Sequence, residues 1–133
     1  MYKTVGRSIL VFDDNLQSSR HLVNALQTST DWQIHFAGSV PQALTHVAAY
    51  LPDGILVSWN VPRMSRSTFL HHLRSSLFGK NIPVVVLVHQ EHMTRQEREK
   101  RGVIVINKSP YSEALPDQLA YAFGWQLPLL KMG

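Results

Sequence analysis

The chain has 133 residues, of which 44% are hydrophobic and 17% charged, and it contains no cysteine. This length fits one domain with a full core, and the missing cysteines exclude disulfides, thiolate metal sites and cysteine chemistry. The formal net charge of +4 bears on solubility and non-specific contacts before it bears on function. No apolar run approaches the roughly 20 residues of a membrane span. The first residues also lack the apolar stretch of a signal peptide, so a cytoplasmic domain without membrane contact is expected.

Five short apolar segments are predicted to be β-strands. They are residues 8–12, 32–36, 54–59, 83–88 and 103–106. The segment 32–36 alternates polar and apolar residues, which is typical of a strand at the edge of a sheet. The segments 54–59 and 83–88 are apolar without alternation, as are strands that a parallel sheet buries on both faces.

Four segments with helical periodicity follow these strands. Their apolar positions are expected to face the sheet: Leu22, Ala25 and Leu26; Val40, Ala43, Leu44, Val47, Ala48 and Leu51; Phe69, Leu70, Leu73 and Leu77; Leu115, Leu119, Ala122 and Phe123. The third helix is expected to follow a loop at 60–65 and to end near Gly79, and the last helix to span about 112–125. The alternation predicts a parallel sheet with helices on both faces. We expect one domain over 1–133, with its core at about 8–125 and residues 126–133 as a tail or linker.

The segment 89–101 is very polar, and Met93 is its only strong hydrophobe. Most helical stability in proteins comes from burying an apolar stripe, which this segment lacks. Ordering its backbone costs about 1–2 kcal/mol per residue. The helix between the last two strands is therefore predicted to be short, shifted or mobile.

Open α/β sheets bind their ligands beyond the carboxyl ends of the strands. The residues found there are Asp13 and Asp14, Ser58 to Asn60, Val88 and His89, and Asn107 and Lys108. No Gly-rich phosphate loop follows any strand, which argues against a dinucleotide or P-loop site. No serine lies in a Gly-x-Ser-x-Gly turn, which argues against a hydrolase.

In this order and spacing, the motifs resemble the receiver domain of two-component response regulators over nearly the whole chain. The stretch Ser58-Trp59-Asn60-Val61-Pro62 is similar to the chemotaxis receiver loop Asp-Trp-Asn-Met-Pro. The stretches 9–15 and 82–87 are similar to the receivers of hybrid histidine kinases. The resemblance implies a flavodoxin-like (βα)5 fold, with a doubly wound parallel five-stranded sheet of strand order 2-1-3-4-5.

The resemblance also implies a chemistry from which this chain departs. In receivers an Asp after the third strand accepts a phosphoryl group from a phosphohistidine and helps an acidic pair to hold Mg²⁺. Ser58 occupies that position, and a hydroxyl does not replace an ionised carboxylate as nucleophile and metal ligand. Receivers have a Ser or Thr at the end of the fourth strand, where this chain has Val88. They often have an aromatic switch residue three positions before the Lys, where this chain has Val105. A degenerate phosphorylation site is thus expected, made up of Asp13, Asp14, Ser58, Val88 and Lys108.

The charged residues of this site leave two interpretations open. Lys108 forms an internal ion pair with Asp13 or Asp14, which is retained because removing one partner strands a charge. Alternatively, Asp13, Asp14 and Asn60 hold a residual Mg²⁺. Two carboxylates without a third ligand bind that ion weakly, so we expect no cofactor, or weak Mg²⁺ at best.

The histidines do not predict a metal site. His71 and His72 are adjacent on a predicted helix and therefore point about 100° apart. His89 and His92 are three residues apart, but the sequence offers no third ligand near them.

The expected function is that of a pseudo-receiver: a phosphorylation-independent interaction module of bacterial two-component signalling, without enzymatic activity. By family analogy its partners are a histidine kinase, an output domain or a second copy, bound at the last helix–strand–helix face. One alternative is a receiver that retains a phosphate or Mg²⁺ response through Asp13 or Asp14. Another is a nucleic-acid-binding accessory domain. The basic residues for it are Arg95, Arg98, Lys100 and Arg101, interleaved with Glu91, Glu97 and Glu99, so the segment is only weakly positive.

Overall fold

The computed structural model describes residues 6–58, 60–88, 103–107 and 114–125. Within these residues the elements are β1 (Ser8–Phe12), α1 (Leu16–Ser29), β2 (Gln33–Ala37), α2 (Val40–Tyr50), β3 (Gly54–Val57), α3 (Arg63–Arg74), β4 (Val84–Val88), β5 (Val103–Asn107) and α5 (Leu115–Phe123). The predicted short or mobile helix in 89–101 and the tail at 126–133 lie outside the described residues.

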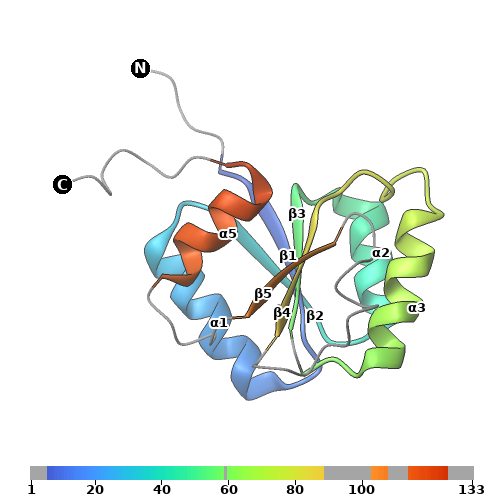
Figure 1. The fold of residues 1–133 in the computed structure, drawn as a ribbon, viewed down its shortest axis with the longest axis horizontal. Coiled ribbons are helices and arrows are strands. Elements are labelled where there is room, and N and C mark those ends of the chain that lie inside the picture. Colours follow the sequence, from blue (N-terminus) through green and yellow to red (C-terminus); the bar gives the residue numbers. More distant parts are fainter. Residues whose placement is uncertain (1–5, 59, 89–102, 108–113, 126–133) are drawn as a thin grey trace.

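The strands form one sheet in the order β2-β1-β3-β4-β5, and every neighbouring pair is parallel. Figure 1 shows α1 and α5 on one face of this sheet and α2 and α3 on the other. The predicted α/β fold with a parallel sheet is therefore confirmed. β2 lies at an edge of the sheet, as its alternating sequence indicates, and β5 continues the sheet beyond β4.

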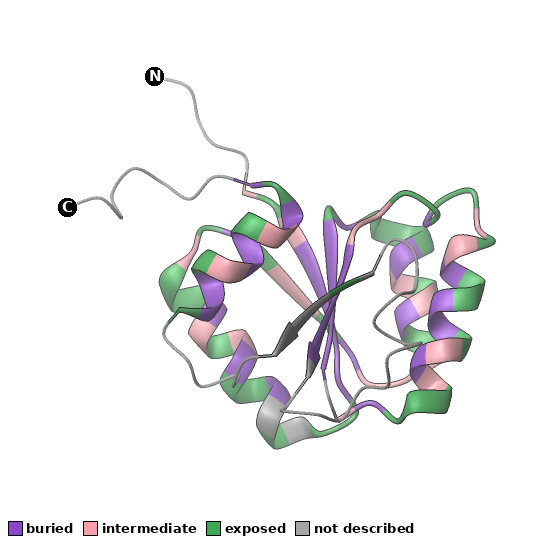
Figure 2. Cartoon of the chain, viewed as in Figure 1, coloured by how far each residue is buried: buried purple, intermediate pink, exposed green. Residues whose placement is uncertain are grey.

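Two apolar layers sandwich the sheet because successive residues of a strand point to opposite faces. Leu10, Phe12, Ile55 and Val57 pack toward α2 and α3 in one cluster. Ile9, Val11 and Leu56 pack toward α1 and α5 in the other. Figure 2 shows the resulting continuous burial along the central strands. Burial on both faces explains why these strands lack polar alternation.

The expected bounds of α3 are wrong at both ends. The helix already begins at Arg63, within the predicted loop, and it ends at Arg74 rather than near Gly79. Leu77, expected to face the sheet, is 85% exposed. The Arg74 guanidinium donates hydrogen bonds to the carbonyls of Gly79, Lys80 and Ile82 at 3.1, 3.2 and 2.8 Å. These bonds stabilise a loop where periodicity alone would continue the helix.

The apolar stripe of α2 is narrower than predicted. Ala43 and Val47 are buried, whereas Ala48 and Leu51 are exposed. Leu51 has already left the helix, with a φ of 48°, and its N–H closes the last turn on Val47. In α5, Ala122 was expected to face the sheet but is only partly buried, whereas Ala120 is buried.

A close backbone approach fixes α5 against the sheet. A Cβ atom at Gly54 of β3 would lie 2.8 Å from the ring of Phe123. That ring stacks on Trp125 at 4.6 Å, and Trp125 meets Trp32 edge-on at 5.1 Å. The ring therefore has little room to yield.

We expect Gly54→Ala to lower the free energy of unfolding by about 1–3 kcal/mol, because the added methyl overpacks this contact. Gly38→Ala is the matched control, since its nearest contact would be an ordinary 3.5 Å, and it should change the free energy by less than about 0.5 kcal/mol. Urea unfolding measures both. Equal effects would contradict the packing described.

A second prediction concerns the imidazole of His46 on α2. Its ring lies 4.6 Å from both His35 of β2 and Tyr50, and its buried Nε2 has no hydrogen-bond partner among the described residues. Burial, and then the charge of His35, lower the pKa of His46. The unfolded chain thus binds this proton more readily, so stability should fall as the pH drops below about 6.5.

Unfolding curves between pH 5 and pH 8 measure this slope. His46→Leu should flatten it because the substitution removes the titrating group. His72→Gln removes an exposed histidine of α3 and should leave the slope unchanged. A wild-type slope in His46→Leu would show that another group causes the acid sensitivity.

Candidate functional site

The candidate site lies at the carboxyl edge of the sheet, where backbone hydrogen bonds hold two loops together. The N–H of Asp13, after β1, donates to Ala37 of β2 at 3.0 Å, and the N–H of Ser58 donates to Phe12 at 2.9 Å. Both Asp13 and Ser58 are completely buried. The sheet therefore brings these two sequence-predicted residues to one place.

The hydroxyl of Ser58 belongs to a tight turn. Its Oγ accepts the N–H of Asn60 at 3.2 Å, and its backbone carbonyl accepts the N–H of Val61 at 3.2 Å. Serine side chains commonly accept the N–H two residues further on in such turns. The Ser58 hydroxyl is therefore a turn-forming oxygen.

The carboxylate of Asp13 joins the two loops. Its Oδ1 accepts the N–H of Asn15, just before α1, at 2.9 Å. The same oxygen accepts a longer bond of 3.5 Å from the side-chain amide of Asn60, which contributes little at that length. Asp14, beside it in sequence, is exposed. The two members of the acidic pair thus have different environments.

Arg66 is a site residue that the sequence analysis missed. It lies near the start of α3, is only 8% exposed, and donates from Nη1 to the carbonyl of Val61 at 2.8 Å. Pro62 precedes α3 and gives it no side-chain cap, so this guanidinium stabilises the loop between β3 and α3. Its spacing to Phe69, Leu70 and Leu73 places it on the buried face, which is the signal that could have revealed it.

The other predicted site residues differ in what the structure describes of them. The backbone of Val88 ends β4 and pairs with Asn107 of β5. Val105 lies within β5. Lys108, with its expected ion pair to Asp13 or Asp14, lies outside the described residues, as do Trp59, His89, His92 and the basic segment from Arg95 to Arg101.

The described donor set does not fit a Mg²⁺ site. Mg²⁺ requires near-octahedral oxygen ligands and loses its water reluctantly. Ser58 supplies no carboxylate, and the Oδ1 atom of Asp13 accepts the N–H of Asn15 at 2.9 Å. The side-chain amide nitrogen of Asn60 lies 3.5 Å from Asp13 Oδ1. His71 and His72 are exposed, with ring centres 5.7 Å apart, and the described part of the chain holds no group of three metal-ligating side chains.

No protein-family model matches the sequence, and no curated protein matches it. Solved structures of response regulator receiver domains do match the fold. The receiver domain of a sensor histidine kinase from Pseudomonas aeruginosa aligns over 90% of this chain and 99% of its own, with 19% identity and a TM-score of 0.72. A chemotaxis response regulator of Vibrio cholerae aligns over 89% and 99%, with 20% identity and a TM-score of 0.71.

A receiver protein from Methanoculleus marisnigri aligns through its N-terminal domain over 86% and 94%, with 22% identity and a TM-score of 0.68. At these identities the likeness establishes the fold: the chain has the flavodoxin-like fold of response regulator receivers. Among its described residues, no helix is long and apolar enough to cross a membrane.

The burial of Asp13 and Ser58 leads to a prediction for the Ser58→Asp variant. A third carboxylate would be buried beside Asp13, where like charges repel each other. We expect the free energy of unfolding to fall by about 1–3 kcal/mol. Added Mg²⁺ should recover part of this loss, since the new charge completes a ligand set.

Ser58→Asn is the control, because it has a similar size and no charge. It should show no recovery with Mg²⁺. Urea unfolding with and without Mg²⁺ measures both variants. A Ser58→Asp variant as stable as the wild type without metal would contradict the described burial of Ser58.

Proposed function

We propose that this chain is a pseudo-receiver, a regulatory module of bacterial two-component signalling that binds other signalling proteins without being switched by phosphorylation. The observation that carries the proposal is Ser58. It lies fully buried at the carboxyl end of β3, with its Oγ accepting the Asn60 N–H, and the resemblance to receivers implies that the nucleophile belongs at this position.

The chemistry of phosphoryl transfer supports this proposal. An ionised carboxylate attacks a phosphohistidine directly, whereas a serine hydroxyl needs a base to accept its proton. Asp13 Oδ1 accepts the N–H of Asn15, and Ser58 Oγ accepts the backbone N–H of Asn60. The loop is therefore held by protein hydrogen bonds where a receiver would use a metal and a phosphoryl group. We infer that the module is not an enzyme.

The proposal also covers the cofactor and the parent protein. The Pseudomonas aeruginosa receiver has a magnesium ion coordinated in its active site cleft. With a serine for the third carboxylate, we expect no cofactor in this chain, or weak Mg²⁺ binding at most. Receivers of sensor histidine kinases are among its structural neighbours, which supports a hybrid histidine kinase or a response regulator of the cytoplasm as the parent protein.

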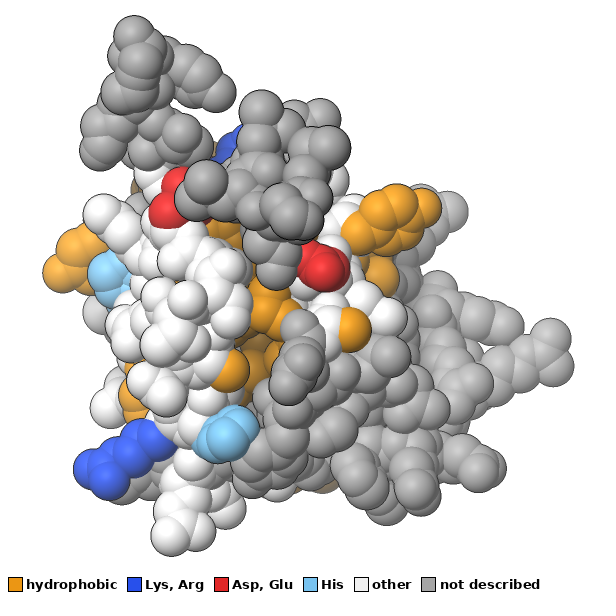
Figure 3. Space-filling model, turned by 90° about the vertical axis from the view of Figure 1, so that its left-hand side faces the viewer, with side chains coloured by type: hydrophobic (Ala, Val, Ile, Leu, Met, Phe, Trp, Pro, Cys, Tyr) orange, Lys and Arg blue, Asp and Glu red, His pale blue; other side chains and the backbone are white. Residues whose placement is uncertain are grey.

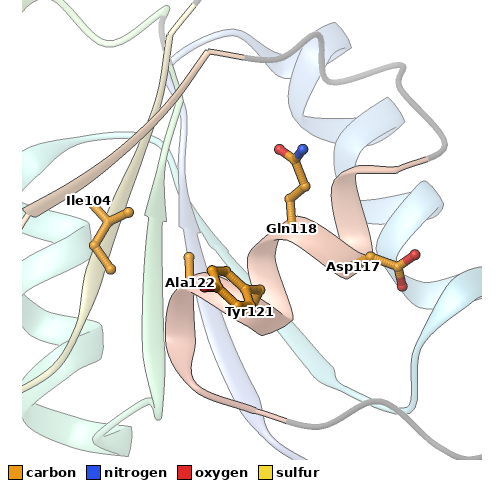
Figure 4. A pocket seen from close by; sticks show the side chains of 5 residues that line it. All are labelled: Ile104, Asp117, Gln118, Tyr121 and Ala122. Carbon is orange, nitrogen blue, oxygen red and sulfur yellow. The ribbon is translucent and has the colours of Figure 1, made fainter.

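The partner surface that we propose is the groove between β5 and α5. The groove has a volume of about 430 Å³ and is lined by Ile104, Asp117, Gln118, Tyr121 and Ala122. Figure 4 shows these side chains around it, and Tyr121 is 88% exposed. Figure 3 shows the neighbouring face over α1 and α5, where hydrophobic side chains reach the surface. A histidine kinase, an output domain or a second copy is the proposed occupant.

A small phosphodonor tests the proposal. Incubation of the wild-type chain with acetyl phosphate and Mg²⁺, followed by intact-mass measurement, should show no added phosphoryl group. A receiver that has its aspartate, treated in parallel, should show one. A phosphoryl adduct that disappears in Asp13→Asn or Asp14→Asn would replace the proposal with the alternative of a residual phosphate response.

A further inference from the structure

A groove with a volume of about 700 Å³ runs along the exposed side of α2, next to β2. It is lined by two rows of α2 residues, each repeating every four positions, and by one residue of β2: Pro41, Thr45 and Ala49; Gln42, His46 and Tyr50; Phe36. Among the described residues, none of α3 or α5 lines this α2 groove. Figure 1 shows α2 on the face of the sheet opposite to α5. The α2 groove is therefore separate from the α5 groove.

The segment that forms this groove has no formally charged side chain. None of residues 32–52 is Asp, Glu, Lys or Arg, although 17% of the whole chain is charged. The segment includes all of β2 and α2, and β2 is an edge strand that pairs only with β1 among the described strands. Edge strands and the outer sides of surface helices ordinarily have charged residues, which oppose association. This face lacks that protection.

Aromatic rings on this face are exposed and yet held in place. Phe36 is 43% and Tyr50 65% exposed. The centre of the Tyr50 ring lies 4.6 Å from that of His46, and Tyr50 stacks on His35 at 5.8 Å with an angle of 11° between the rings. These contacts limit the rotamers of Tyr50, so the side chain loses less conformational entropy on association. Aromatic residues are also enriched at protein interfaces, so this face suits a protein partner.

The lack of charge indicates which partner fits. In a twofold-symmetric dimer, residues near the axis face their own counterparts, so a charged residue there would meet a like charge. An uncharged segment avoids this repulsion. Burial, and then the charge of His35, lower the pKa of His46, so this imidazole is also neutral at about pH 7.5. Interfaces between different proteins have no such constraint and use opposite charges for specificity. The face is therefore complementary to itself.

We propose that the α2 groove is the interface of a homodimer, in which the α2 helices of two copies pack against each other across a twofold axis. Helix residues four positions apart form ridges that fit between the ridges of a second helix, and both rows of the groove have this spacing. Thr45 is the middle residue of α2 and is exposed, so in this dimer it lies beside the axis. The dimer requires neither phosphorylation nor the α5 groove, so its failure would leave the proposed function intact.

Sedimentation velocity of the full chain at about pH 7.5 tests the proposal. The wild type should form a concentration-dependent dimer, and its amide signals at residues 36 and 41–50 should shift with concentration. Thr45→Arg and Thr45→Glu should each raise the dimer dissociation constant at least about tenfold, because each places like charges beside the axis. An equimolar mixture of the two variants should form a heterodimer, since the charges at the axis are then opposite.

Two controls add the same charge elsewhere. Met64→Arg changes a residue of α3 that is 81% exposed, and Tyr121→Arg changes the α5 groove; both should dimerise as the wild type does. A wild type that is monomeric at every concentration, or a dimer that persists in both Thr45 variants, would overturn the proposal. A dimer lost in Tyr121→Arg but not in Thr45→Arg would assign the association to the α5 groove and also overturn it. Concentration-dependent shifts confined to other residues of the wild type would overturn it without any variant.

Discussion

Helices cover both faces of β1 and β3, so the residues of these strands are buried from Ile9 to Phe12 and from Gly54 to Val57. A buried strand has no place for an unpaired polar group. Polar side chains therefore come after the ends of β1 and β3. Because the strands are parallel, these ends lie at the same edge of the sheet. The backbone hydrogen bonds from Ser58 to Phe12 and from Asp13 to Ala37 are the last ones of this parallel pairing. They determine which side chains lie next to one another.

At this edge, hydrogen bonds hold the loops after β1 and β3 in place. Ser58 Oγ closes the turn to Asn60, Asp13 contacts the start of α1, and Arg66 holds the carbonyl of Val61. Each polar group has a role in fixing the two loops. In the function that we propose, this edge keeps the receiver architecture without a group that would react with phosphate.

The strands were predictable because burial on both faces leaves a direct record in the sequence, an apolar run without alternation. The meeting of Asp13, Ser58 and Asn60 was also predictable, because the rule for carboxyl ends and the motif order both place them at one edge. The end of α3 was not. Leu77 follows Leu73 by four residues and continues the stripe, but three carbonyl contacts from Arg74 favour a loop. Helical periodicity indicates which residues are buried. It does not indicate which carbonyl groups an arginine side chain contacts.

In the function that we propose, the Ser58 hydroxyl is a structural acceptor and takes no part in chemistry. Amide hydrogen exchange at Asn60 tests it most directly, because that N–H donates to Ser58 Oγ. We expect faster exchange at Asn60 in Ser58→Ala than in the wild type, with unchanged exchange at Val86 in the core. Exchange at Asn60 that is the same in both proteins would contradict this role of Ser58.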